Sequence, residues 1–77
     1  SGGGPRGGSR GEPARMLSDR QLEIFEMVGR GFDSHNIAEK LSLSAKTVDA
    51  HKANIRQKLG LASARELLME AVRWVEK

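Results

Sequence analysis

The chemical feature that stands out in this sequence is a group of cationic side chains within one short segment. Segment 46–58 has a net charge of +3, from Lys46, Asp49, Lys52, Arg56 and Lys58. Residues 17–77 carry ten basic and nine acidic groups, so the rest of this region has a net charge of −2. Closely spaced cations can contact the phosphate oxygens of a nucleic acid, but a charged stripe is also the usual solvated face of a helix. Charge alone leaves both interpretations open.

The apolar residues around this segment have the spacing of two helices joined by a tight turn. Ile37, Ala38 and Leu41 form the apolar stripe of a short helix. The small side chain of Ala38 permits a close helix crossing, while Leu43 in the turn and Val48 beyond it pack the second helix onto the first. This is the pattern of a helix-turn-helix, in which the exposed front of the second helix enters the major groove of DNA. The spacing therefore favours a nucleic-acid interface over a solvated face.

Capping signals predict the first two helices that surround this segment. The first begins after Ser18, with Gln21 closing a capping box, and ends at Arg30–Gly31. Within it, Gly29 costs about 1 kcal/mol relative to Ala but permits a close helix crossing. The second helix is short, with Ser34 as its expected cap, and ends near residue 41.

Two further helices follow the turn. The third is expected to run from about Ala45 to Leu59, with Ser44 as its N-cap and Gly60 as its C-cap. Ser63 and Glu66, three residues apart, predict a capping box that opens the fourth. No segment alternates like a strand. The predicted fold class is therefore all-α: a compact four-helix domain containing a helix-turn-helix, preceded by a disordered tail.

Composition limits the chain to one small domain. It has 77 residues, no cysteine and no apolar run that could span a membrane. Residues 1–16 are rich in Gly, Pro and Ser, and are expected to be a flexible linker or tag remnant. A basic arm that uses Arg6, Arg10 and Arg15 on phosphate is the alternative. Residues 17–77 are the predicted domain.

The domain resembles the LuxR-type helix-turn-helix, the DNA-binding end of many bacterial two-component response regulators. The resemblance covers about four-fifths of the chain and is carried by these stretches: Leu17-Ser18-Asp19-Arg20, Glu23-Ile24-Phe25, Gly31, Ile37-Ala38-Glu39-Lys40-Leu41, Ser44-Ala45-Lys46-Thr47-Val48, His51, Asn54-Ile55 and Lys58-Leu59-Gly60-Leu61. Gln21 stands where the family usually has Glu, and Ala64 where it often has Arg. The sequence therefore leaves open whether the neighbouring Arg65 replaces that Arg in its contacts at the start of the fourth helix.

The resemblance implies sequence-specific binding of double-stranded DNA by a bacterial transcription regulator, with the third helix in the major groove. Lys46, Asp49, Ala50 and Ala53 would then lie toward the bases, where Lys46 could reach either guanine or a phosphate. Asp49 can accept a hydrogen bond from cytosine, and the alanines can meet thymine methyl groups. The plainer alternative for Asp49 is an acid in the first turns whose charge suits the helix dipole. For the alanines it is that a small side chain simply leaves room for close approach.

Other side chains of the third helix are expected to contact the DNA backbone rather than the bases. These are Thr47, Lys52 and Arg56, which would position the protein without reading sequence. Lys58 is expected to be solvated. Asn54 is expected either to bind phosphate or to brace a loop.

The fourth helix has more apolar residues than one buried stripe needs. Most could be core, but a dimer surface of Met69, Val72 and Arg73 is the alternative, and the resemblance implies dimers of this helix on DNA. It also implies an N-terminal receiver or other regulatory domain in the parent protein, RNA polymerase as a candidate partner, and a cytoplasmic location.

Other function classes receive less support. No nucleophile with a base, no paired acids and no phosphate-binding loop are present, so no enzymatic activity, catalytic residue or cofactor is predicted. His35 and His51, without nearby Cys, do not form a metal-ligand set. The alternative function is a helical protein-interaction or dimerisation module built on the fourth helix. The promoter-reading end of a sigma factor shares the helix-turn-helix plan, but the matched stretches favour the regulator.

Overall fold

The computed structural model describes residues 13–76, and over this range the protein is all-helical. A turn of helix at residues 13–16 precedes the longer helices, which are α2 (Asp19–Gly29), α3 (Ser34–Leu41), α4 (Ala45–Leu59) and α5 (Ala64–Val75). No strand occurs within the described residues. The predicted fold class is confirmed, and α4 has the predicted bounds.

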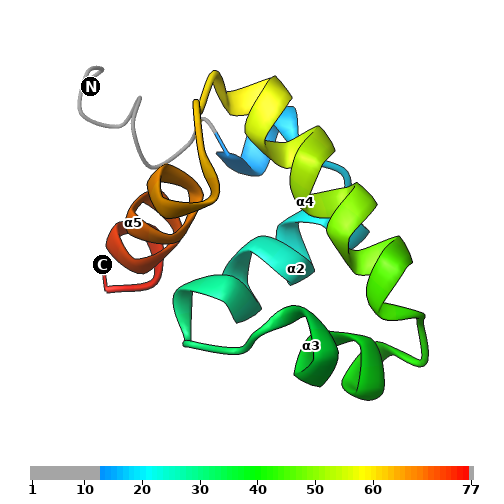
Figure 1. The fold of residues 1–77 in the computed structure, drawn as a ribbon. Helices are drawn as coiled ribbons and strands as arrows, with labels where there is room; N and C mark the ends of the chain where they lie inside the picture. Colours follow the sequence, from blue (N-terminus) through cyan, green and yellow to red (C-terminus); the bar gives the residue numbers. More distant parts are fainter. Residues whose placement is uncertain (1–12, 77) are drawn as a thin grey trace.

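Helix α2 lies in the middle of the fold and packs against two others. It contacts α5 along one side and α4 along another, while α3 packs beneath α4 (Figure 1). The largest buried side chains come from all four helices: Phe25, Ile24, Ile37, Ile55, Leu67 and Val48. No single pair of helices could bury this set alone, so each helix depends on the others for its stability.

The ends of α2 and α4 are capped as the sequence predicts. Ser18 and Gln21 form a complete capping box at the start of α2, and Ser44 accepts the backbone N–H of Thr47 at the start of α4. Gly60 ends α4 in the left-handed region, at φ 70°. These local signals are sufficient to set both ends of the helix that carries the cations.

One predicted cap and one predicted capping box differ from the structure. The cap of α3 is Asp33, whose carboxylate accepts the N–H of Asn36 at 2.8 Å, and Ser34 is the first helical residue. Asp and Ser are equally good N-caps, so the prediction of Ser34 was wrong by one residue. At α5, Ser63 does cap the helix, but Glu66 reaches the N–H of Ala62 at 2.9 Å and not that of Ser63.

The helical part of the chain begins earlier than expected. Pro13 is buried and its carbonyl accepts the N–H of Leu17 at 3.0 Å, so residues 13–16 are not the flexible linker that composition suggested. The rest of that predicted linker, with Arg6 and Arg10 of the alternative basic arm, lies outside the described residues. No helix in the described part of the chain is long and apolar enough to cross a membrane.

The packing of α2 against α5 depends on a glycine. A Cβ atom built on Gly29 would overlap the backbone carbonyl of Ala71 and would lie 3.0 Å from Cγ1 of Val75. Backbone cannot move aside as a flexible side chain can, so the two helices approach this closely only because residue 29 lacks a side chain. The close crossing anticipated for Gly29 is confirmed.

Substitution of Gly29 by Ala should destabilise the domain, although Ala is the better helix former. The gain in helix propensity is about 1 kcal/mol, whereas overpacking against a backbone costs about 1–3 kcal/mol or more. Because the clash is with backbone, we expect the upper part of that cost and a net loss of about 1–2 kcal/mol in the free energy of unfolding, measured by urea denaturation followed by circular dichroism. The control is Glu23→Ala on the exposed side of α2, with a change of about 0.5 kcal/mol or less. A Gly29→Ala protein as stable as the parent would contradict the close approach.

Candidate nucleic-acid interface

Helices α3 and α4 meet across a tight three-residue connection. Ser42 adopts the left-handed conformation at φ 58°, and the N–H of Leu43 bonds back to the carbonyl of Ala38 at 2.9 Å. Ile37 of α3 and Val48 of α4 are both fully buried. The turn and this apolar contact together fix α4 against α3, which leaves the opposite side of α4 exposed.

The exposed side of α4 carries most of the predicted DNA-binding residues. Five of the seven predicted DNA-binding side chains are exposed: Lys46, Thr47, Asp49, Ala50 and Ala53. We call this set the outer face of α4. It lies opposite Val48 and Ile55, as the helical period requires. The two small alanines leave the helix backbone open to close approach along this face. Asn54, which is expected either to bind phosphate or to brace a loop, is also exposed.

Lys52 and Arg56 lie at the margin of the outer face, and each is half-buried. The Lys52 ammonium donates to the hydroxyl of Ser34 at 2.8 Å, and that hydroxyl donates to Oδ1 of Asp49 at 2.5 Å. Nη2 of Arg56 donates to the carbonyl of Ala62 at 3.2 Å, while its Nε is buried with no partner among the described residues. Both cations therefore also hold α4 to neighbouring segments.

Lys58 is exposed, as predicted, but its side chain is not only solvated. Its ammonium donates to Oε1 of Gln21 at 2.9 Å, and the same oxygen accepts the N–H of Ser18 at 3.1 Å. Gln21 is buried, so the end of α4 is tied to the first turn of α2. Lys58 and Gln21 are 37 residues apart, and no local pattern in the sequence indicates their contact. The one hint in the sequence is that Gln21, a capping residue, also lies on the inner side of its helix, where a distant residue can reach it.

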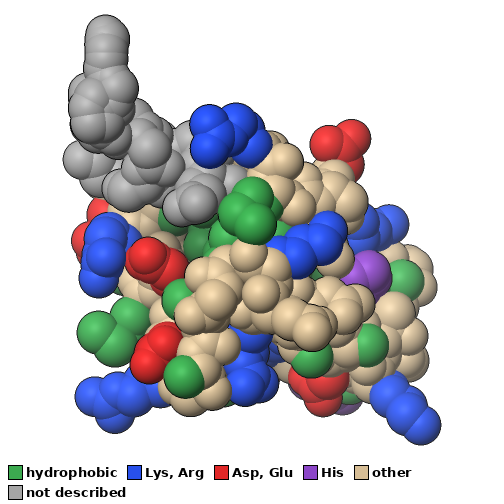
Figure 2. Space-filling view, turned by 90° about the horizontal axis from the view of Figure 1, so that it is seen from above, with side chains coloured by type: hydrophobic (Ala, Val, Ile, Leu, Met, Phe, Trp, Pro, Cys, Tyr) green, Lys and Arg blue, Asp and Glu red, His purple; other side chains and the backbone are tan. Residues whose placement is uncertain are grey.

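The charge on the surface is mixed. In the view of Figure 2, Lys and Arg side chains of the described residues lie among Asp and Glu side chains, without one large patch of a single sign. This agrees with the small net charge of residues 17–77. The small net charge gives the domain as a whole little attraction for an anionic partner, so any such attraction depends on local clusters such as the cations of α4.

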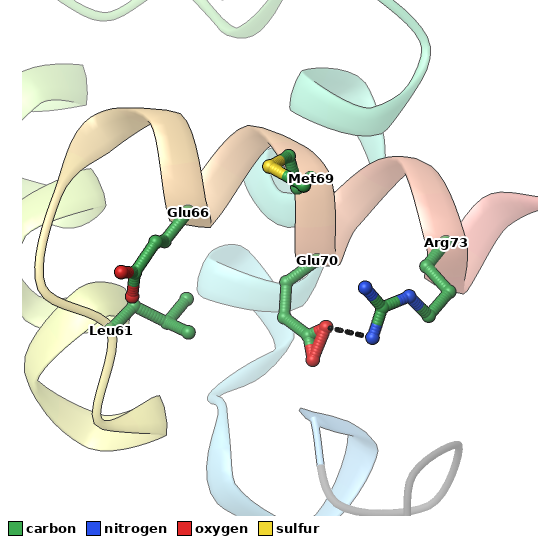
Figure 3. Close-up of a pocket in the computed structure, with 5 residues that line it drawn as sticks. All are labelled: Leu61, Glu66, Met69, Glu70 and Arg73. Atoms are coloured by element: carbon green, nitrogen blue, oxygen red, sulfur yellow. Dashed lines mark ion pairs between the residues drawn. The ribbon is translucent and has the colours of Figure 1, made fainter.

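Helix α5 presents the residues predicted for a dimer surface. Leu68 and Met69 are 45% and 51% exposed, and Val72 is half-buried. Figure 3 shows a pocket at the side of α5 that is lined by Met69 and by Glu70 and Arg73, which form an ion pair 3.3 Å apart. The pocket is completed by Leu61 and Glu66. The structure thus leaves apolar side chains of α5 uncovered within the described part of the chain.

The described residues contain no group of three or more His, Cys, Asp or Glu side chains that could hold a metal ion. His35 is exposed in the first turn of α3, and His51 is half-buried on α4. The structure does not bring the two histidines into a common site with carboxylates.

This arrangement defines a class of protein: a small helical domain built around a helix-turn-helix. The chain belongs to the family described as "Bacterial regulatory proteins, luxR family", whose model matches residues 15–71. The suspected family is therefore confirmed, and the match begins within the helical turn that precedes α2.

Curated relatives agree with this assignment. The chain is 48% identical over 65 residues to the oxygen regulatory protein NreC of Staphylococcus carnosus, which is 84% of this chain and 30% of that protein. It is 47% identical over 62 residues to the protein of the same name in Staphylococcus aureus strain JH9, with 80% and 29% covered. The chain thus spans less than a third of the length of these relatives. No significant match to a solved structure was found.

Removal of the Lys58 ammonium should lower stability, because the buried oxygen of Gln21 would lose one of its two donors. We expect Lys58→Ala to reduce the free energy of unfolding by about 1 kcal/mol, measured by urea denaturation. Lys46→Ala removes the same charge from an exposed position of the same helix and should change it by about 0.5 kcal/mol or less. Equal effects of the two substitutions would mean that the bond between α4 and α2 contributes nothing.

Proposed function

We propose that this domain binds double-stranded DNA sequence-specifically, with α4 in the major groove, as the output domain of a bacterial transcription regulator. The observation that supports this most strongly is the outer face of α4. It is exposed and flanked by cations, and α4, the helix that carries it, packs against α3. The major groove is about 12 Å wide and admits one helix with its side chains. Membership of the luxR family supports the same conclusion.

Within the outer face, we assign base contacts to Lys46, Asp49, Ala50 and Ala53. A lysine can donate to guanine and a carboxylate can accept from the amino group of cytosine. The exposed methyl groups of the alanines can contact thymine methyls. These four side chains belong to the first three turns of α4, which is the part that a helix-turn-helix directs to the bases.

Thr47, Lys52 and Arg56 are assigned to the DNA backbone. An ammonium has three N–H donors and a guanidinium has five, so the bonds to Ser34 and Ala62 leave others for phosphate oxygens. The buried Nε of Arg56 lacks a partner among the described residues, which leaves this guanidinium under-satisfied. Cations that are already positioned by the fold lose less side-chain entropy on binding.

The parent protein is proposed to carry a regulatory domain, because the curated relatives are more than three times as long as the matched segment. An N-terminal receiver domain is the form that fits a response regulator. RNA polymerase is a further proposed partner, and the cytoplasm is the proposed location. No enzymatic activity is proposed for the domain.

The first experiment is selection from a randomised pool of DNA duplexes with the 77-residue chain, followed by fluorescence anisotropy on the recovered duplex across a salt series. We expect a defined sequence to be enriched and the affinity to fall steeply with salt, because phosphate contacts release counterions. Absence of both enrichment and binding at low salt would overturn the proposal and favour a protein-interaction module that uses α5.

Substitutions separate the two kinds of contact. Lys52→Ala and Arg56→Ala should each weaken binding to all sequences and reduce the salt slope by about one. Asp49→Ala should instead relax the preference at one base pair and leave the slope unchanged. Arg56→Lys keeps the positive charge, so it is the control that separates loss of the phosphate contact from loss of the bond to the loop at Ala62. If the three alanine variants changed slope and preference alike, the division of roles would be wrong.

Dimerisation is proposed to occur on DNA through α5, at Met69, Val72 and Arg73. The free chain should be monomeric at micromolar concentration in sedimentation velocity, whereas an inverted repeat should bind two copies cooperatively. Met69→Asp places a charge on this surface and should abolish the cooperativity while leaving half-site affinity within about twofold. Met16→Asp is a matched control, because Met16 is 41% exposed but lies outside α5. A stable dimer without DNA, or cooperativity that survives Met69→Asp, would contradict the proposal.

A further inference from the structure

A chain of hydrogen bonds links the outer face of α4 to the first residue of α3. The ammonium of Lys52 donates to Oγ of Ser34 at 2.8 Å, and the Ser34 hydroxyl donates to Oδ1 of Asp49 at 2.5 Å. Ser34 is 15 residues before Asp49 and 18 before Lys52, and it is half-buried at the start of α3. A serine hydroxyl of α3 therefore bonds directly to a side chain of the outer face.

The chemistry of the three groups determines the direction of this chain. An ammonium can only donate, an ionised carboxylate can only accept, and a hydroxyl can do both. The Ser34 proton must therefore point at Asp49 while its lone pair faces Lys52. Alanine at this position could make neither bond.

Ser34 is available for this role because it does not cap its helix. Asp33 accepts the N–H of Asn36 and provides the cap of α3. The Ser34 hydroxyl is thus released from the local bond that serine most often makes at a helix start. It points across the helix-turn-helix and bonds to α4 instead.

We infer that Ser34 is a positioning residue that sets the base preference of Asp49, although it lies outside the helix that reads the bases. This inference rests on the proposed function, in which α4 reads base edges. With Oδ1 held by Ser34, the carboxylate has one orientation, and Oδ2 is left for the amino group of a base. An exposed aspartate without this bond would have to lose its rotamer freedom on binding. Lys52 also offsets the repulsion between this carboxylate and nearby phosphates.

The test uses the duplex recovered with the wild-type chain and a set of duplexes that each change one base pair. The position that Asp49 reads is the one whose preference is lost in Asp49→Ala. In Ser34→Ala, we expect the preference at that position to fall about three- to tenfold, while preferences at other positions change less than twofold. Ser34→Thr keeps the hydroxyl and should restore the preference.

A double substitution separates positioning from general support of the helix. In the Asp49→Ala background, Ser34→Ala should have no further effect on preference, because the group it positions is absent. The inference is overturned if Ser34→Ala keeps the full preference, or if it weakens all positions alike. Two other results would also overturn the inference. One is that Ser34→Ala changes the preference as much in the Asp49→Ala background as in the parent chain. The other is that Asp49→Ala by itself loses no preference at any position.

The outcomes for the inference and for the proposed function are distinguishable. A wild-type chain that enriches no sequence overturns both, because no base is then read. A wild-type chain with a clear sequence preference that Ser34→Ala leaves intact overturns only the role of Ser34.

Discussion

The fold depends on α2 packing against α4 and α5 at the same time. Ile24 and Phe25 of α2 are fully buried, and Gly29 allows the backbone of α5 to approach. Its first turn is joined to the end of α4 through Gln21 and Lys58. A domain of this size has a small core, and short helices are not stable alone in water. The position of the outer face of α4 therefore depends on a helix that contributes no residue to it.

The basic residues of α4 serve the fold as well as the surface. Lys52, Arg56 and Lys58 each donate to a residue outside α4, namely Ser34, Ala62 and Gln21. The net charge of segment 46–58 thus overstates the charge that is simply solvated. The same bonds orient the cations, so structural support and a surface suited to phosphate do not exclude one another.

The parts of the structure that follow from local chemistry were predictable from the sequence. Ser44 and Gly60 defined both ends of α4, and the spacing from Ile37 to Val48 indicated the helix-turn-helix. Where two neighbouring residues cap equally well, as Asp33 and Ser34 do, local preference could not choose between them. The contact between Lys58 and Gln21 depends on how distant helices pack, and no periodicity reports it. The link from Ser34 to Asp49 was missed for the same reason.

The aromatic contact between α2 and α5 gives the protein an intrinsic spectroscopic reporter. Trp74 is the only tryptophan in the chain, and its ring lies 5.7 Å from that of Phe25, centroid to centroid, at an interplanar angle of 58°. It is half-buried on α5, whereas the outer face belongs to α4. Its emission therefore follows the separation of α2 from α5. A ligand on the outer face of α4 therefore alters this signal either through a shift of the helices or through a contact that forms on α5 itself.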